Sequence, residues 1–188
     1  MIGGDGRAAD DDGDVFTIGH STRTFTEFVS LLRQVSVDLV VDIRSFPRSR
    51  ANPAYDISVL PATLAAHGID YRHLAALGGR RHRRAGDPPS KNLLWRETSF
   101  RSYADYAETD AFRGGLDTLL ILARDHRVAI MCAEAVWWRC HRRIVADHLI
   151  ARGARVEHIL AAGRVTSAVL TPGAIVRPNG TVQYPSST

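Results

Sequence analysis

Lysine and cysteine are the residues that this chain of 188 residues almost lacks, since it contains Lys91 alone and only Cys132 and Cys140. Two cysteines are too few for a disulfide framework, which favours a reducing environment. The sequence also has no apolar run near the roughly 20 residues that cross a bilayer. Its first residues lack the basic-then-apolar order of a signal peptide. These absences argue against the disulfide-rich secreted and membrane-spanning classes and predict a cytoplasmic protein.

The positive charge of the chain is carried almost entirely by arginine. The net charge is +4, and the first fourteen residues hold five aspartates against one arginine, so the remainder is more basic than the whole. Guanidinium groups match phosphate and carboxylate geometry better than ammonium groups do, which favours an anionic partner such as a nucleotide or nucleic acid. A compositional bias towards alanine, arginine and glycine explains the overall excess more simply, but it does not explain each arginine cluster.

Short apolar runs alternate with amphipathic segments along the chain, which predicts an α/β fold. The expected strands are residues 15–21, 38–45, 69–74, 127–132 and 155–160. The expected helices are residues 24–35, where Thr24 and Glu27 fit a capping box, then 59–67, two within 99–125, and 139–153. We therefore predict a single domain with a mainly parallel sheet and helices on both faces, in a Rossmann-like three-layer arrangement.

The predicted domain has a flanking segment at each end. The acidic, Gly-rich residues 1–14 are expected to be a disordered lead-in, and residues 15–162 are expected to form the α/β domain. Residues 163–188 contain several proline, glycine and serine residues and are expected to be an extension, with an edge strand or an arm.

Polar and reactive residues follow the expected strands at their carboxyl ends. The first four strands are followed by GHST, DIRSFPRSR, HLAALGGRRHRR and CAEAVWWRCHRR, whereas the opposite ends are shorter and plainer. Ligands of open α/β sheets bind beyond the carboxyl ends of the strands. The sequence therefore predicts a functional site at this edge of the sheet.

Three segments occur in a fixed order along the chain: TIGHSTRTFTEFVSLL, VVDIRSFPRSR and CAEAVWWRCHRRIVADHL. Together they resemble the DUF488 family, a set of small bacterial proteins of unknown function. The similarity runs from about Phe16 to Leu160. The resemblance implies an α/β domain over residues 15–162, but it implies no established reaction, so the chemistry has to be argued from the residues.

Cys132 is the first candidate for a catalytic residue. It is expected where the fourth strand ends and a helix begins, so the helix dipole and nearby arginines would lower its pKa. We therefore expect Cys132 to react faster than Cys140, which is placed within the next helix. Glu134 and His20 complete the candidate catalytic set, with His20 as a general base or hydrogen-bond donor. The alternative for Cys132 is a buried and inert thiol.

The candidate substrate-binding residues surround the same edge. Asp42 and Arg44 share a face of the second strand, and they either pair with each other or contact a substrate. The loop GGRRHRR is expected to bind phosphates. Ser21 and Thr22 are expected to cap the following helix as well. The full predicted set is Ser21, Asp42, Arg44, Arg48, Arg80, Arg81, Arg139 and His141.

Some of these side chains have plainer interpretations. His141 has the spacing of a core histidine, because it lies on the same helical face as two later apolar residues. The three tryptophans offer stacking faces for bases, or they pack in the core as most tryptophans do. They are Trp95, Trp137 and Trp138.

Three functions remain open from the sequence. The leading hypothesis is an enzyme that acts on an anionic, nucleotide-like or nucleic-acid-like substrate through thiol or acid–base chemistry. The second is a nucleic-acid-binding accessory protein without catalysis. The third is a zinc or iron protein using Cys132, Glu134, Cys140 and His141, with His20. The metal hypothesis ranks below the thiol hypothesis because the spacing lacks a paired ligand motif, so no cofactor is predicted.

Overall fold

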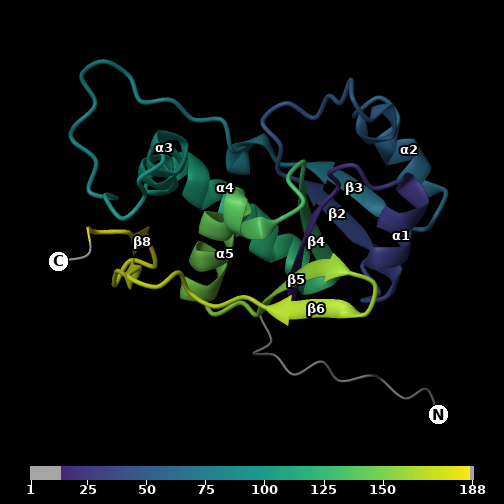
Figure 1. Ribbon diagram of the computed structural model, residues 1–188. Coiled ribbons are helices and arrows are strands. Elements are labelled where there is room, and N and C mark those ends of the chain that lie inside the picture. Colours follow the sequence, from purple (N-terminus) through teal and green to yellow (C-terminus); the bar gives the residue numbers. More distant parts are fainter. Residues whose placement is uncertain (1–13, 187–188) are drawn as a thin grey trace, which may run out of the picture.

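The computed structural model describes residues 14–186, which form an α/β fold (Figure 1). The strands are β1 Val15–Gly19, β2 Leu39–Asp42, β3 Asp70–His73, β4 Val128–Cys132, β5 Val156–Ala161, β6 Arg164–Ser167, β7 Ile175–Val176 and β8 Val182–Gln183. The helices are α1 Phe25–Arg33, α2 Leu60–Ala65, α3 Thr98–Ala107, α4 Asp110–Asp125 and α5 Arg142–Ala151, with the short 3₁₀ turns η1 Pro53–Tyr55, η2 Ala75–Leu77 and η3 Trp137–Arg139.

The expected lead-in of residues 1–14 lies outside the described residues except for Asp14. The Asp14 carboxylate is 3.1 Å from Nε of Arg155, and this ion pair lies at the amino end of the sheet. Among residues 14–186, no helix combines the length and the apolar character needed to cross a membrane.

The main sheet has the strand order β3-β2-β4-β1-β5-β6, and the first five of these strands are parallel. The expected parallel sheet is therefore confirmed. The edge strand β6 is antiparallel to β5 and comes from the first residues of the expected extension. Strands β1 and β4 are neighbours, so the loops that follow them leave the sheet side by side at its carboxyl edge.

Helices cover both faces of the sheet, as Figure 1 shows with α1 and α2 on one side and α3, α4 and α5 on the other. Alternate residues of β4 point to opposite cores: Ile130 packs with α3, α4 and α5, and Met131 packs with α1 and α2. Helix α1 begins with the expected capping box, in which Thr24 and Glu27 exchange hydrogen bonds. Ser21 and Thr22 are not its caps, because the helix starts after Thr24.

One expected helix starts later than its sequence pattern indicates. The pattern favours a helix from residue 139, but Trp137–Arg139 form the 3₁₀ turn η3 and α5 begins only at Arg142. Cys140 lies between them in an extended conformation, with φ −131° and ψ 150°. The Trp137 ring stacks on His158 at 4.3 Å, which holds the turn against β5. The expectation that Cys140 lies within a helix is therefore wrong.

Hydrogen bonds from residues 182–184 to His148 and Asp147 hold the C-terminal part of the chain against α5. Nδ1 of His148 donates a hydrogen bond to the Ile144 carbonyl at 2.9 Å, and Nε2 accepts one from the Val182 N–H at 3.3 Å. Nearby, the Asp147 carboxylate accepts a hydrogen bond from the Tyr184 hydroxyl at 2.8 Å. Both nitrogens of the neutral His148 ring are therefore used, and burial lowers its pKa to about 4 from 6.5.

Acid should weaken the fold through His148. The unfolded chain binds a proton near pH 6.5 and the folded chain only near pH 4, so stability is lost as the pH falls between these values. The shift corresponds to about 3 kcal/mol. We expect His148→Gln to lose less stability than wild type between pH 7 and pH 4.5 in urea unfolding. His126→Gln, at a half-buried site near the surface, should follow wild type. Equal losses in all three proteins would contradict the role of His148.

Candidate functional site

A cavity of about 890 Å³ opens at the carboxyl edge of the sheet, where the site is predicted. This volume is in the range of small-molecule sites. The loops after β1, β2, β3 and β4 contribute to its wall, together with the first turns of α3 and the start of α5. Its lining residues include His20, Arg44, Ser45, Phe46, Arg48, Ser49, Arg50, Gly79, Arg80, Phe100, Tyr103, Cys132, Glu134, Arg139, Cys140 and His141.

The cavity brings together most of the residues selected from the sequence. The ones that line it are His20, Arg44, Arg48, Arg80, Cys132, Glu134, Arg139 and His141. Ser21, Asp42 and Arg81 do not line it. Asp42 is fully buried, and Ser21 has a positive φ of 45° with its N–H bonded to the Ala133 carbonyl. The Arg81 guanidinium lies 3.7 Å from the centre of the Tyr106 ring and donates to main-chain carbonyls.

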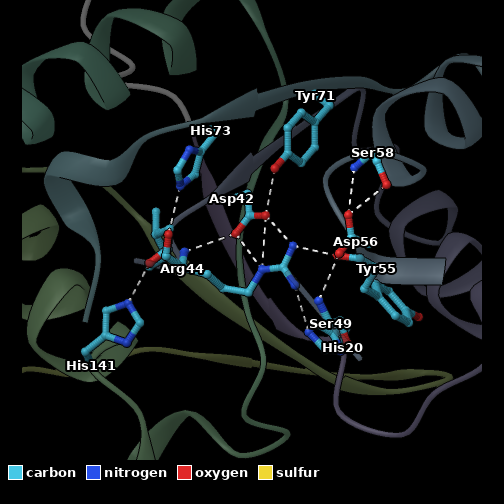
Figure 2. Close-up of polar contacts among 11 residues, drawn as sticks. His20, Asp42, Arg44, Ser49, Tyr55, Asp56, Ser58, Tyr71, His73 and His141 are labelled. Atoms are coloured by element: carbon cyan, nitrogen blue, oxygen red, sulfur yellow. Dashed lines mark hydrogen bonds and ion pairs between the residues drawn. The ribbon is translucent and has the colours of Figure 1, made fainter. Parts of the chain in front are cut away.

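Asp42 and Arg44 form a buried ion pair beneath the cavity (Figure 2). Nε and Nη2 of Arg44 donate to the two carboxylate oxygens at 2.9 and 2.6 Å, and the Tyr71 hydroxyl donates to the same carboxylate at 2.8 Å. Nη2 also donates to the Tyr55 carbonyl at 2.8 Å. The pairing alternative for Asp42 and Arg44 is thus the one found in the structure. Arg44 forms a fixed positive edge of the cavity.

His20 faces the cavity as a neutral ring. It stacks on Tyr55 at 4.2 Å, its Nδ1 donates to the Ser21 carbonyl, and its Nε2 accepts from Nη1 of Arg44 at 3.4 Å. Burial, reinforced by the charge of Arg44, lowers its pKa to about 4. Because both ring nitrogens already have partners, His20 is placed to hold Arg44 and the cavity wall rather than to accept a proton near neutral pH.

Two histidines hold the backbone that follows β2, and Figure 2 shows them on either side of Arg44. Nε2 of His73 is 2.8 Å from the Arg44 carbonyl, and Nε2 of His141 is 3.0 Å from the Ile43 carbonyl. A carbonyl can only accept, so each Nε2 carries a hydrogen. The other nitrogen of His141, Nδ1, is therefore directed at Sγ of Cys140, at 3.4 Å.

The two cysteines meet at the cavity wall although they come from different elements. Sγ of Cys132, at the end of β4, is 2.8 Å from Sγ of Cys140, just before α5. Both thiols are free and nearly buried, with exposed fractions of 2% and 3%. Cys140 is also 3.5 Å from the Arg142 N–H. The fold therefore brings the two cysteines of the segment CAEAVWWRCHRR into contact as a pair.

The pKa directions reverse the order expected from the sequence. Burial raises the pKa of the Cys132 thiol well above its ordinary value, and its hydrogen bond to Cys140 adds to this. Burial also opposes ionisation of Cys140, but the hydrogen bond from Cys132, the His141 ring and Arg142 together hold its pKa well below the ordinary value. These directions favour ionisation of Cys140 before Cys132. The higher reactivity expected of Cys132 from the sequence stays a prediction.

Arg142 is the main residue that the sequence analysis missed. It is 1% exposed, its Nη2 donates to the Glu134 carbonyl at 2.6 Å, and its Nε is buried without a hydrogen-bond partner. In the described part of the chain no carboxylate pairs with it, and buried charges normally require a counter-ion. Against the effect of burial, the Cys132 and Cys140 thiols beside it raise the pKa of Arg142, so a thiolate of this pair can supply the negative charge. The signal was available, because Arg142 falls on the same helical face as the buried Val145 and Leu149.

The main chain at Gly19 lies very close to the main chain at Glu134, which holds the segment after β4 against β1. A Cβ atom at Gly19 would lie 1.7 Å from the Glu134 carbonyl oxygen, so only glycine fits there. The next N–H, of His20, donates to the Cys132 carbonyl at 3.0 Å. The Glu134 side chain is exposed, and it is the main chain of Glu134 that accepts from Arg142.

The described residues give no support to the metal hypothesis. Among residues 14–186, no group of three or more His, Cys, Asp or Glu side chains is placed to hold a metal ion. A tetrahedral zinc ion would hold two sulfur ligands about 3.8 Å apart. The Cys132 and Cys140 sulfurs are closer than that, at 2.8 Å.

The arginine loop GGRRHRR divides into structural and accessible parts. Arg83 pairs with Asp105 at 3.1 Å, and the Arg81 guanidinium donates hydrogen bonds to main-chain carbonyls. Both side chains therefore hold the loop against α3. Arg80 is exposed and lines the cavity with Arg50, which the sequence analysis did not select. The signal for Arg50 was its place at the end of DIRSFPRSR, in the loop after β2.

The tryptophans do not line the cavity, whereas a phenylalanine does. Trp95 is buried and Trp137 is stacked on His158, so both serve packing. Trp138 is exposed, but its side chain does not line the cavity. Phe46 lines the cavity with 68% of its surface exposed, and the Arg80 guanidinium lies 5.7 Å from the centre of its ring.

The comparisons with known proteins give one match. The family model described as a domain of unknown function, DUF488, matches residues 24–149, which hold α1, the ion pair, the arginine loop and both cysteines. No curated protein and no solved structure is significantly similar to the chain.

Proposed function

Because the chain belongs to the DUF488 family, a domain of unknown function, we propose its function from the site itself: a thiol-dependent enzyme that acts on an anionic substrate. Cys140 is the nucleophile, and the arginine-lined cavity holds the anion. The observation that carries this proposal is the buried Arg142 beside Cys140, since a guanidinium without a carboxylate partner stabilises a thiolate.

The surroundings of Cys140 are those of an activated nucleophile. His141 is oriented by its hydrogen bond to the Ile43 carbonyl, so its Nδ1 is held 3.4 Å from the Cys140 sulfur. A nucleophile, a neighbouring imidazole and a third group that orients the imidazole form the usual arrangement for thiol catalysis. Cys132 donates its hydrogen bond to the thiolate and is the partner thiol. Glu134 and His20 shape the wall.

The cavity favours a negatively charged substrate. Arg48, Arg50, Arg80 and Arg139 are exposed and line it, and among residues 14–186 no carboxylate pairs with any of the four. Guanidinium groups in this arrangement bind phosphate or carboxylate groups through paired hydrogen bonds.

Phe46 favours an anion that also carries a planar ring, such as a nucleotide. The ring is exposed and the Arg80 guanidinium lies 5.7 Å from its centre, so a base can stack on the ring while its phosphates contact the arginines. A nucleic-acid-binding protein without catalysis would use the same surfaces but would not need the thiolate. Salt-dependent polyanion binding that is unchanged in Cys140→Ala, with no thiol reactivity, would favour that second function.

The test is mass-resolved alkylation of the native protein with iodoacetamide at pH 7. We expect Cys140 to be modified at least about tenfold faster than Cys132, because the thiolate is the reactive form. Inorganic pyrophosphate should slow modification of Cys140 by occupying the cavity. The variant Arg48→Gln/Arg50→Gln/Arg80→Gln should lose this protection.

The matched control removes the same number of charges elsewhere. Arg72, Arg124 and Arg164 are exposed and lie outside the cavity, so their replacement by glutamine should leave the protection intact. Equal and slow labelling of both cysteines would contradict a nucleophilic Cys140. Unchanged protection in the cavity variant would contradict the anion site.

A further inference from the structure

The pairing of the two thiols indicates what chemistry follows the first attack. Their sulfurs are 2.8 Å apart, both line the cavity, and the chain has no other cysteine. A nucleophile that acted alone would not need a second thiol in contact with it. A thiol next to a thiolate is the arrangement of a pair in which one sulfur attacks a disulfide and the other displaces the product.

We propose that the site carries out thiol–disulfide exchange with an anionic low-molecular-weight disulfide, with Cys140 as the attacking thiol and Cys132 as the resolving thiol. This proposal rests on the proposed function for its assignment of Cys140 as the nucleophile and of the cavity as an anion site. The substrate class follows from the cavity, whose arginines bind carboxylate or phosphate groups on the two halves of the disulfide.

The exchange consists of two balanced steps. In the first, the Cys140 thiolate attacks one sulfur of the substrate R–S–S–R′, a Cys140–S–S–R bond forms, and the S–S bond of the substrate breaks to release R′–S⁻. In the second, Cys132 gives up its proton and its thiolate attacks the Cys140 sulfur, the Cys132–Cys140 disulfide forms, and the S–S bond of Cys140–S–S–R breaks to release R–S⁻, which takes up the proton as R–SH. The protein is oxidised by two electrons, and the substrate disulfide is reduced by two.

The geometry suits both steps. Before the reaction the two sulfurs are 2.8 Å apart. A charged Cys140 sulfur can only accept a hydrogen bond, so Cys132 is then the donor and stays protonated while the attacking sulfur is charged. After the first step the charge on Cys140 is gone. Burial still raises the pKa of Cys132, but the part of the increase that came from the charged Cys140 sulfur is thereby removed. Forming the protein disulfide then needs the sulfurs to close to about 2.05 Å.

The experiment uses 5,5′-dithiobis(2-nitrobenzoate), a disulfide with a carboxylate on each half, as the probe. Wild type should release two nitrothiobenzoate ions per chain and become lighter by two hydrogens, with Cys132 linked to Cys140 in the peptide map. Cys132→Ser should release one ion and keep the other half bound to Cys140. Cys140→Ser should react at least about tenfold more slowly than wild type.

The anion requirement has its own control. The variant Arg48→Gln/Arg50→Gln/Arg80→Gln should slow the reaction with the charged probe by about tenfold at low salt. It should slow the reaction with the neutral bis(2-hydroxyethyl) disulfide much less, because the halves of this probe carry no charge for the arginines to bind. Equal slowing with both probes would overturn the assignment of an anionic substrate.

The outcomes separate this proposal from the proposed function. If wild type releases one ion and keeps the adduct on Cys140, resolution by Cys132 is wrong and the nucleophile stands. If neither cysteine reacts in the folded protein while both react after unfolding, the nucleophile and the exchange are both wrong. The wild-type stoichiometry decides the question even if Cys132→Ser does not fold.

Discussion

Asp42→Ala is expected to lower the free energy of unfolding by about 3–5 kcal/mol, because it leaves a buried guanidinium without its counter-ion. Arg44 is 7% exposed and Asp42 is fully buried, so solvent cannot replace the lost carboxylate. The Tyr71 hydroxyl loses its acceptor at the same time. Urea unfolding at pH 7 measures the difference. The loss should appear in the midpoint with little change in the slope.

A surface ion pair provides the comparison for Asp42. Arg152 and Asp117 are 2.7 Å apart, with exposed fractions of 35% and 52%. Exposed pairs contribute only about 0–1 kcal/mol, so Asp117→Ala should be nearly neutral. If Asp42→Ala is also within about 1 kcal/mol of wild type, the Asp42–Arg44 pair does not organise the fold as we describe.

Arg142→Met is expected to have the largest effect on the thiol. Removing the neighbouring cation should raise the pKa of Cys140, because an opposite charge in contact favours the thiolate. The midpoint of the alkylation rate against pH should therefore move upward. At a pH between the two midpoints, the rate should fall by about tenfold or more, since one pKa unit is a tenfold change in thiolate.

Neighbouring variants separate the charge of Arg142 from its packing. Arg143 lies beside it in the chain, but its guanidinium contacts Trp95 and the Thr171 hydroxyl rather than the thiols. Arg143→Met should therefore keep the wild-type midpoint. Arg142→Lys should restore part of the shift because it keeps the positive charge. A midpoint for Arg142→Met that matches wild type would show that the thiolate does not depend on this guanidinium.

Periodicity and strand ends were sufficient to predict the fold and the edge of the sheet at which the cavity opens. The apolar runs at β1, β2 and β4 are long enough to be recognised, and their neighbouring polar loops converge because parallel strands end at one edge. The boundary of α5 was missed by three residues, since the helical spacing from 139 onward is real. Only the packing of Trp137 on β5 shows that the helix starts later.

The contact between the two cysteines, and which of them ionises first, could not be predicted from the sequence because both depend on tertiary packing. Dipole and charge arguments applied to single residues favoured Cys132, because they treat each thiol in isolation. Which sulfur carries the charge depends on a contact between Cys132 and Cys140, and on the direction of Nδ1 of His141. Both are set by tertiary packing, so a sequence pattern does not contain them.

The close approach at Gly19 has a consequence for how mutations in this chain are interpreted. Since any side chain at this position would collide with the Glu134 carbonyl, selection for folding alone will retain glycine there. Position 19 would then be as intolerant as a catalytic position in a library of variants screened for growth or yield. Such a screen cannot tell whether the segment GHST is retained because the fold requires it or because the reaction does. Intolerance becomes informative about mechanism only at Cys132 and Cys140, where a serine of similar size preserves the packing and removes the sulfur.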